Sequence, residues 1–552
     1  MKFFEKERLL IATLILFSAS LFFIGLGAMS LTDPDEVFYA ETAKEMLNRH
    51  QMLTPYIFGE PQFEKPPLYY WLVILGFKVF GINEFAARVA SAIFGILGVV
   101  SVYFLGKILM DRKTGFCAGI TLATSIEYLV LSRACVTDIV LGVFILCAFL
   151  FFFHGYLAGS GKTRYYLLSS LFLGLSVLTK GPVGVFLPFV IIGIYVILTR
   201  EIKLLKEVPF IRGTLLFLVV SLPWYLLMYK AHGRKFIDVF FGFHNVIRFL
   251  EPEHKWGDVF YYYFPNVIVG FFPWIMFLPL GIWQVFREEN RRFRKAGIFL
   301  ITWFLVIFTF FSFSRTKLPT YIFPLYPALA LLTGRFWGIF LDKGLTQKME
   351  RAMKGFLGIF LISIAGGMIG LSVITAKRYP PVTGVSVITG IIFVSLMTFF
   401  ITALLKRRYT ASLIALLLSF IILVFPLSYV ILPEIAKYES SKEVSAKVLT
   451  FMEPGERLGA ETQYRRGVAF YTNREDILDV HRHHIITTFL NGKERVWCII
   501  KDKNHIQLYT DEKHPYDKPT YVVYKSGKKV IITNKAPKSG EFLKVRTKDA
   551  PF

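Results

Sequence analysis

The chain has 552 residues, of which 54% are hydrophobic and only 18% are charged. Many apolar runs of about twenty residues, the length that crosses a hydrocarbon core, exceed what a soluble domain buries. The net charge of +24 fits a protein beside anionic membrane lipids, and no basic stripe of a nucleic-acid-binding fold accompanies it. The composition therefore predicts a polytopic α-helical membrane protein with membrane lipids, and not nucleic acid, as its partners.

Thirteen apolar stretches are candidate membrane spans. They are 8–30, 84–109, 115–132, 138–158, 165–180, 183–199, 212–230, 261–286, 296–313, 319–338, 355–376, 385–405 and 411–432. The stretch 68–80 is apolar and aromatic but too short to cross, so we expect a helix on the membrane surface there. The predicted membrane domain is 1–433, with exterior loops at 31–83 and 231–260.

The orientation follows from the basic residues of the connecting loops. With a cytoplasmic N-terminus, the loop 287–295 lies in the cytoplasm, and it carries four arginines and one lysine. The opposite connections, such as 133–137 and 314–318, hold one or two cations each. Because cytoplasmic loops carry an excess of Lys and Arg, this arrangement is self-consistent and places the loop 31–83 outside.

The composition changes after Pro433 and becomes that of a soluble domain. Short β-branched runs at 496–500, 520–524 and 529–533 predict strands. An odd number of spans places this part on the same side as the first loop. We therefore predict a small α/β domain over 434–552 on the exterior side of the membrane.

The exterior stretch from Asp33 to Lys65 carries charges between membrane-length apolar runs, where a charge needs a partner or a function. Asp33, followed by proline and with Glu36 three residues on, is typical of a helix N-terminus. For these two carboxylates we prefer the capping interpretation. Asp35 and Tyr39 are four residues apart, so this helix places both on one face, and they are the first functional candidates.

Polar residues from distant loops are predicted to meet at the exterior face. They are Asp35, Tyr39, Glu64, Lys65, Arg133, Asp138, Lys180, His244, Asn245, Arg248, His254, Arg315, Lys317 and Tyr321. For any single cation, the alternative is an anchor that extends to the membrane interface. That alternative is weaker for the whole set on one face.

This set of residues suggests displacement of a phosphate leaving group near a membrane. Lys65 and Arg248, with Lys180 or Arg315, are candidates to hold a lipid phosphate, since preorganised cations stabilise its developing charge. The carboxylates Asp35 and Asp138 are suited to position an acceptor or to stabilise an oxocarbenium-like sugar ring.

A divalent metal ion is a further candidate. Glu64 and His244 carry ligand groups of the right kind. A histidine in an aromatic loop is more often only hydrogen-bonded, so the metal and the structural interpretation both stay open.

At these residues the chain resembles the GT-C membrane glycosyltransferases, and in particular the undecaprenyl-phosphate aminoarabinose:lipid A transferase family of the protein O-mannosyltransferase clan. The motifs are Asp35-Glu36-x-x-Tyr39-Ala40-Glu41, Phe63-Glu64-Lys65-Pro66-Pro67-Leu68, Thr137-Asp138, Leu178-Thr179-Lys180-Gly181-Pro182 and Thr316-Lys317-Leu318-Pro319-Thr320-Tyr321. They span roughly residues 1–435.

The resemblance implies a multi-pass enzyme of the bacterial inner membrane whose active site faces the periplasm. It implies Asp35 and Asp138 as catalytic candidates, a lipid-phosphate or metal site around Glu64, Lys65, His244 and Arg248, and supporting roles for Tyr39, Lys180 and Tyr321. The expected donor is a polyprenyl-phosphate sugar and the expected acceptor is lipid A.

Two alternatives remain from the sequence. Transfer to protein or to another glycolipid fits the same motifs, because no motif identifies a sugar or an acceptor. A transporter is disfavoured, since its ionisable groups usually lie mid-membrane on broken helices and its halves often repeat.

The topology is testable with fused reporters. A reporter fused after residue 290 should report cytoplasm, and one fused after residue 440 should report periplasm, because the basic loop 287–295 is retained inside. Finding both reporters on one side would separate the proposed site residues onto two faces of the membrane.

Overall fold

The computed structural model of the chain describes residues 2–247, 251, 259–343, 347–511, 515–538 and 540–545. Its chain forms two compact units. The first comprises Met1–Leu26, Phe63–Leu72 and Arg88–Pro426, and the second comprises Gly27–Gln62, Val73–Ala87 and Leu427–Phe552. The second unit thus brings the segment after the first predicted span together with the C-terminal part of the chain. The predicted domain boundary near 433 stays a prediction beside this division.

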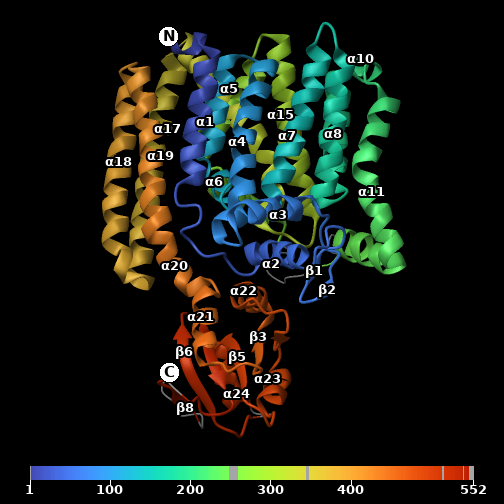
Figure 1. Cartoon of the computed structure of the whole chain (residues 1–552). Coiled ribbons are helices and arrows are strands. Elements are labelled where there is room, and N and C mark those ends of the chain that lie inside the picture. The colour runs from blue at the N-terminus through green and yellow to red at the C-terminus, as the bar shows by residue number, and fades with distance from the viewer. Residues whose placement is uncertain are drawn as a thin grey trace. The chain divides into compact units, whose positions relative to one another are not determined.

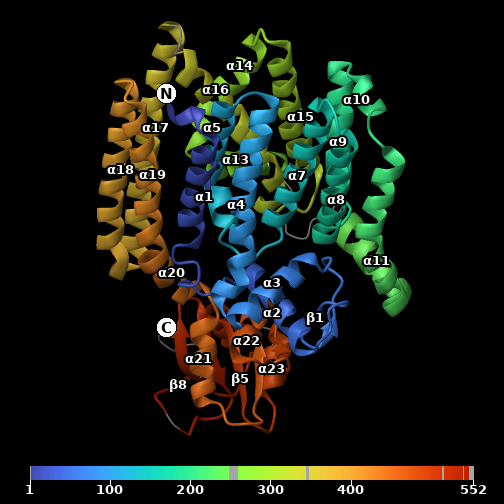
Figure 2. The ribbon, with the colours of Figure 1, turned by 45° about the horizontal axis from the view of Figure 1, so that its top comes forward.

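Helices build the first unit, and Figures 1 and 2 show the long ones running side by side. The α-helices, including two that extend into the second unit, are α1 (Glu7–Phe23), α3 (Leu68–Phe80), α4 (Glu84–Leu109), α5 (Arg112–Thr124), α6 (Ile126–Leu131), α7 (Asp138–Leu157), α8 (Lys162–Lys180), α9 (Val183–Thr199), α10 (Ile202–Lys206), α11 (Phe210–Ile237), α13 (Tyr263–Gly270), α14 (Leu278–Arg287), α15 (Arg291–Phe313), α16 (Tyr326–Lys343), α17 (Gln347–Arg378), α18 (Thr383–Leu405) and α19 (Tyr409–Pro426). Shorter 3₁₀ or π turns are η1 (Lys2–Glu5), η2 (Asp238–Ile247), η4 (Phe260–Tyr262), η5 (Trp274–Phe277), η6 (Pro319–Leu325) and η7 (Pro380–Val382).

Each of the thirteen predicted ranges contains helix, and the helix predicted at 68–80 is α3. Its place on the membrane surface stays a prediction. In the described part of the chain, eight helices are long and apolar enough to cross a membrane, or nine if α13 and α14, bent by 103°, form one span. The chain is therefore a multi-pass membrane protein, as predicted. Thirteen crossings remain a prediction.

Small residues let the helices of the first unit approach closely. A Cβ added to Gly334 of α16 would lie 2.7 Å from the backbone nitrogen of Ala118 in α5. On the same face of α16, a Cβ added to Gly338 would lie 2.9 Å from the Thr114 hydroxyl. In lipid, where the hydrophobic effect gives helices little reason to associate, such close backbone packing is what stabilises the pair.

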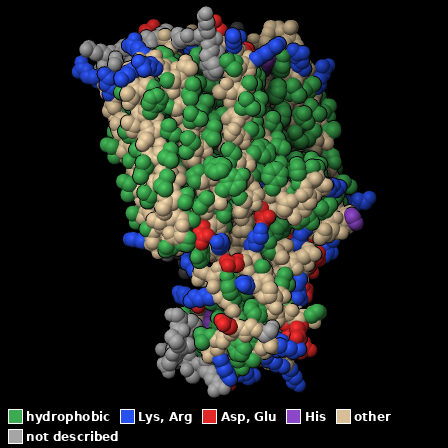
Figure 3. All heavy atoms as spheres, turned by 60° about the vertical axis from the view of Figure 1, so that its left-hand side comes forward, with side chains coloured by type: hydrophobic (Ala, Val, Ile, Leu, Met, Phe, Trp, Pro, Cys, Tyr) green, Lys and Arg blue, Asp and Glu red, His purple; other side chains and the backbone are tan. Residues whose placement is uncertain are grey.

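The lipid-facing surface of this unit is apolar. Ile211 and Ile362 are 79% and 73% exposed, as side chains that face acyl chains should be. Figure 3 shows hydrophobic side chains over these helices, with Lys and Arg gathered at the end of the helices where the chain begins. This distribution fits a cytoplasmic N-terminus.

The C-terminal part of the second unit is a small α/β domain, as predicted. The six strands are β3 (Arg457–Ala460), β4 (Leu478–Asp479), β5 (Val496–Lys501), β6 (Thr520–Ser526), β7 (Lys529–Thr533) and β8 (Leu543–Val545), in the order β4-β3-β5-β7-β6-β8. Around them lie α20 (Leu432–Glu439), preceded by η8 (Leu427–Ile431), and α21 (Lys442–Phe451), α22 (Thr462–Thr472), α23 (His483–Leu490) and α24 (Asp502–Thr510). The three β-branched runs identified in the sequence are β5, β6 and β7.

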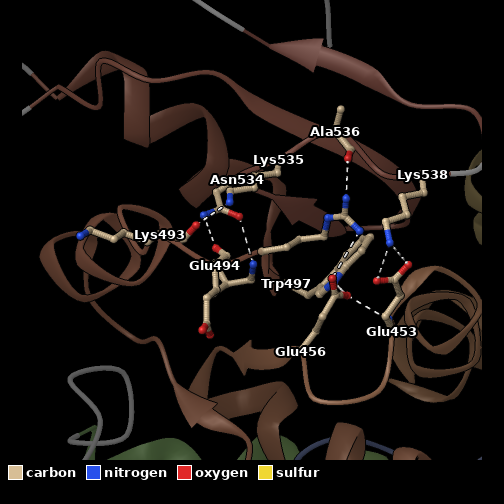
Figure 4. A network of polar contacts seen from close by, with 11 residues as sticks. Glu453, Glu456, Lys493, Glu494, Trp497, Asn534, Lys535, Ala536 and Lys538 are labelled. Atoms are coloured by element: carbon tan, nitrogen blue, oxygen red, sulfur yellow. Dashed lines mark hydrogen bonds and ion pairs between the residues drawn. The ribbon is translucent and has the colours of Figure 1, made fainter.

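Strand β5 is buried on both faces, which explains its continuous apolar sequence. Cys498 and Ile500 face one apolar cluster, and Trp497 and Ile499 face the other. The beginning of β5 is fixed by polar contacts (Figure 4). Glu456 accepts a hydrogen bond of 2.6 Å from the indole nitrogen of Trp497, and Asn534 accepts one of 3.0 Å from the Val496 amide.

The second unit also contains helix α2 (Asp35–Asn48), which packs on α22. Glu41, fully buried, pairs with Lys44 at 2.8 Å. The Lys44 ammonium also donates to the carbonyl oxygens of Ala469 and Phe470, at 3.1 and 3.2 Å, in the last turn of α22. A cation at a helix C-terminus is favourable because the last carbonyls there lack intrahelical partners.

Another carboxylate of α2 binds a tight turn. Glu45 accepts hydrogen bonds from the amides of Phe58 and Gly59, at 2.6 and 3.0 Å. Both residues have positive φ, 55° and 77°, and they join β1 (Tyr56–Ile57) to β2 (Glu60–Pro61). The guanidinium of Arg465 in α22 stacks on the Phe58 ring, 3.7 Å from its centroid. The turn is therefore half-buried and held by contacts within the second unit.

The predicted N-terminal cap of α2 is wrong. The helix begins at Asp35, and the Asp33 carboxylate accepts a hydrogen bond of 2.5 Å from the hydroxyl of Ser441 instead of capping. Glu36 accepts from the backbone amide and hydroxyl of Thr32, both at 3.0 Å. The cap fails because a partner 408 residues away along the chain takes the Asp33 carboxylate.

Burial raises the pKa of Asp33 from 3.8 to about 7, although the Ser441 hydroxyl and the Lys529 charge lower it. The folded state thus holds a proton that the unfolded state has lost, and this residue costs stability as pH rises from about 4 to about 7. We expect Asp33→Asn to raise the melting temperature near pH 8 and to change it little near pH 4. The measurement is thermal unfolding in detergent across this range.

Glu494→Gln, at an exposed position of the same unit, is the control and should shift neither end of the pH profile. A melting temperature of Asp33→Asn that lies below the wild type at every pH would show that the carboxylate is a net stabilising group.

Candidate active site

An ion pair joins two helix ends in the first unit. Asp138 is the first residue of α7, and Lys180 is the last residue of α8. The Lys180 ammonium donates to Oδ1 of Asp138 at 2.5 Å, and both side chains are largely buried, 12% and 7% exposed. A carboxylate at a helix N-terminus and a cation at a helix C-terminus are each stabilised by the helix dipole. Because α7 and α8 are antiparallel neighbours, the negative charge favoured at the start of α7 lies beside the positive charge favoured at the end of α8.

The Gly181-Pro182 sequence explains why α8 ends where it does. Gly181 has φ of 89°, a value that side-chain-bearing residues rarely adopt. Pro182 directly precedes α9, and its ring favours a helix start. Gly181 and Pro182 therefore have a structural role in this turn. Lys180 is the residue of the motif that is a candidate for the chemistry.

Tyr321 completes this cluster. The Lys180 ammonium lies 4.9 Å from the centroid of the Tyr321 ring, a cation–π geometry that holds a lysine in place. Tyr321 belongs to η6, which packs on α7 where Gly142 leaves room, since a Cβ there would lie 2.7 Å from the Phe323 ring. The structure thus brings together three of the predicted site residues, Asp138, Lys180 and Tyr321.

Two more predicted cations lie on the segment before η6. Lys317 is buried, with 6% of its surface exposed, whereas Arg315 is exposed. The segment is fixed by the Thr316 hydroxyl, which donates to the carbonyl oxygen of Glu251 at 2.8 Å. Arg133, in contrast, donates to the Leu21 carbonyl oxygen at the end of α1, at 2.7 Å, so the structure gives it a capping contact there.

The Phe63-Glu64-Lys65 motif is anchored by its phenylalanine. Phe63 is buried, and its ring lies 5.0 Å from the His232 ring and 5.7 Å from the Phe236 ring. Glu64 and Lys65 are half-buried. The aromatic contact therefore fixes the backbone from which both charged side chains extend.

The structure describes the other predicted site residues of this region only in part. Arg248 lies outside the described residues, and His244 is described only in its backbone, within η2. Among the described residues, no group of three or more His, Cys, Asp or Glu side chains is placed to hold a metal ion. The metal site at Glu64 and His244 stays a prediction.

In the second unit, the structure separates the two candidates of α2 by burial. Asp35 is exposed, and Tyr39 is 8% exposed with its ring against that of Phe38, at 5.1 Å. The sequence interpretation gave no role to the buried pair Glu41–Lys44. Burial raises the pKa of Glu41 to about 7, with Lys44 lowering it. The i, i+3 spacing of opposite charges was the available signal.

Comparisons with known proteins agree with this architecture. A family model described as dolichyl-phosphate-mannose-protein mannosyltransferase matches residues 64–226. An uncharacterized protein of Aquifex aeolicus is 33% identical over 68% of this chain and 82% of its own length. The undecaprenyl phosphate-alpha-4-amino-4-deoxy-L-arabinose arabinosyl transferase of Pectobacterium atrosepticum is 28% identical over 73% of this chain and 72% of that protein. Another Aquifex aeolicus protein, 32% identical, is matched over 61% of its length.

Two solved structures share the fold. ArnT from Cupriavidus metallidurans, in a crystal structure with bound undecaprenyl phosphate, superposes with a TM-score of 0.79 at 22% identity, over 95% of this chain and 98% of that one. The oligosaccharyltransferase of Archaeoglobus fulgidus superposes with a TM-score of 0.51 at 13% identity, over 99% and 75%.

Fold and family model together define the chain as an enzyme, a membrane glycosyltransferase of the GT-C class. Within this class, it is similar to the undecaprenyl phosphate-alpha-4-amino-4-deoxy-L-arabinose arabinosyl transferases, at 28% identity.

Substitutions in the ion pair test whether it acts in catalysis as one unit. Asp138→Asn and Lys180→Gln should each reduce the rate of glycosyl transfer by about tenfold or more. The transfer rate of the double variant should be only slightly below that of the less active single variant, because the two side chains share one contact. The measurement is transfer rate by purified variants whose melting temperatures show that they are folded.

The exposed pair Lys162–Glu207, at 2.7 Å, provides the matched control. Lys162→Gln and Glu207→Gln should leave the rate unchanged. Full activity in folded Asp138→Asn, or strictly additive losses in the double variant, would contradict a joint role for the buried pair.

Proposed function

We propose that this enzyme transfers a glycosyl unit from a polyprenyl phosphate, such as undecaprenyl phosphate, to lipid A at the periplasmic face of the bacterial inner membrane. The observation that carries the proposal is the buried Lys180 held between the Asp138 carboxylate and the Tyr321 ring. A buried ammonium fixed in this way is a preorganised partner for an anion that forms during the reaction.

The chemistry follows from the donor. The bond between the anomeric carbon and the phosphate oxygen breaks, its electron pair leaves with the polyprenyl phosphate, and an acceptor oxygen bonds to the anomeric carbon. Lys180 would donate to the departing phosphate, where charge-assisted hydrogen bonds are strongest. Asp138 would hold Lys180 in place, and its negative charge would stabilise positive charge on the sugar ring.

The other predicted residues have supporting roles in this proposal. Lys65, Arg248, Arg315 and Lys317 are proposed to bind the donor phosphate or the acceptor. Asp35, exposed on α2, is proposed as the second carboxylate at the sugar, with Tyr39 supporting its helix. If a divalent ion binds, Glu64 and His244 would supply ligands, and the ion would offset phosphate charge.

The proposed sugar and its lipid carrier rest on the relatives. The arabinosyl transferases named above support an aminoarabinose donor, and the undecaprenyl phosphate bound to the Cupriavidus metallidurans enzyme supports a polyprenyl carrier. The cationic loop 287–295 supports the periplasmic orientation. The alternative acceptor is a protein or another glycolipid.

The acceptor is tested by the mass of lipid A from cells of a host that lacks its own transferase. Cells expressing the chain should yield lipid A heavier by one sugar residue, and cells expressing folded Asp138→Asn should not. Lipid A of unchanged mass beside a newly glycosylated protein or glycolipid would replace lipid A as the acceptor. The absence of any glycosylated product would contradict the proposed transfer.

A further inference from the structure

The first unit contains a cavity that is distinct from the Asp138–Lys180 site. Its volume is about 800 Å³, and its lining comes from α1, α5, η5, α16, α18 and α19. The walls are largely apolar and include Phe116, Ile120, Leu404 and Leu417. A cavity of this size and lining suits a hydrocarbon chain.

The charged residues that line this cavity are cations. Arg407 and Arg408, in the turn between α18 and α19, line it and are exposed. Within the described part of the chain, neither arginine forms an ion pair with a carboxylate. Two adjacent guanidinium groups beside an apolar cavity match a ligand with an anionic head and an apolar body.

A buried hydrogen-bond donor in the cavity lining narrows the class of ligand further. Trp337 is only 7% exposed, and its indole N–H makes no hydrogen bond with any described residue. Trp274, which also lines the cavity, donates its indole N–H to the Thr124 hydroxyl at 2.8 Å. A buried N–H without an acceptor costs its full desolvation, so an acceptor oxygen on a bound molecule would satisfy it.

The position of Trp337 along α16 sets the depth of that oxygen. Trp337 precedes the last residue of α16, Lys343, by six positions, which is about 9 Å along a helix. Headgroup layers add roughly 5–7 Å to each side of the hydrocarbon core. With Lys343 at the outer edge of the headgroup layer, the Trp337 indole would lie near the boundary between headgroups and acyl chains, where glycerophospholipids carry their ester carbonyls. A polyprenyl phosphate has only hydrocarbon at that depth.

We propose that this cavity binds an anionic glycerophospholipid. Its phosphate lies against Arg407 and Arg408, an ester carbonyl accepts a hydrogen bond from the Trp337 indole, and an acyl chain fills the apolar part. The bound lipid would join α18 and α19 to α1, α5 and α16 at the predicted cytoplasmic end. This site is independent of glycosyl transfer.

Native mass spectrometry of the delipidated full-length protein tests the site. The probes are phosphatidylglycerol, phosphatidylcholine and undecaprenyl phosphate, each titrated separately. Phosphatidylglycerol should bind at least about tenfold more tightly than phosphatidylcholine, because the choline cation beside the same phosphate would repel the two guanidinium groups.

Variants locate the binding. The double variant Arg407→Gln and Arg408→Gln should weaken phosphatidylglycerol binding by about tenfold or more, and Trp337→Phe by roughly threefold to tenfold. Ala411→Trp, which fills the cavity without removing a polar contact, should abolish binding and covers the case in which Trp337→Phe does not fold. Lys406→Gln is the matched control, because this exposed neighbour does not line the cavity, and it should leave affinity unchanged.

Three results would overturn the proposal. One is equal affinity for phosphatidylcholine and phosphatidylglycerol. Another is unchanged phosphatidylglycerol affinity in the folded variants. The third is tight binding of undecaprenyl phosphate that persists in Trp337→Phe, which would assign the cavity to a polyprenyl lipid.

Discussion

A buried ion pair on two helix ends is the constraint on which the candidate active site depends. Neither Asp138 nor Lys180 is stable alone in this environment, since breaking a buried pair costs roughly 3–5 kcal/mol. Their pairing at 2.5 Å requires that α7 begin and α8 end at the same level. The Gly181-Pro182 turn ends α8 at Lys180, and Gly142 lets η6 carry Tyr321 toward the pair. Motifs that are distant in sequence thus serve one contact.

In the second unit, most carboxylates of the first exterior loop have structural partners. Asp33 binds Ser441, Glu41 pairs with Lys44, and Glu45 binds the turn at Phe58 and Gly59. These contacts hold α2 on α22 of the C-terminal domain. Asp35 lies in the first turn of α2, and its side chain is exposed. The C-terminal domain therefore helps to fix the helix that carries Asp35.

The sequence was informative where local patterns decide structure. The predicted ranges 84–109 and 183–199 coincide with α4 and α9, and the β-branched runs coincide with β5, β6 and β7, because apolar length and strand alternation are local properties. The topology also placed Asp138 and Lys180 on one face before any contact was known.

Long-range contacts account for what the sequence did not predict. The cap at Asp33 failed because Ser441, far along the chain, binds that carboxylate. The burial of Glu41 depends on α22, which no local pattern reveals. The break between α13 and α14 is a 103° bend within one apolar stretch, and composition alone does not distinguish a bent pair from a straight span.

The proposed mechanism depends above all on Lys180 being the cation beside the donor phosphate. A structure of the full-length enzyme with a nonhydrolysable polyprenyl-phosphate sugar tests it directly. We expect a phosphate oxygen about 2.7–2.9 Å from the Lys180 ammonium, with Asp138 still in contact with the lysine. A donor phosphate held by other cations, with the Asp138–Lys180 pair intact and out of contact with the donor, would contradict it.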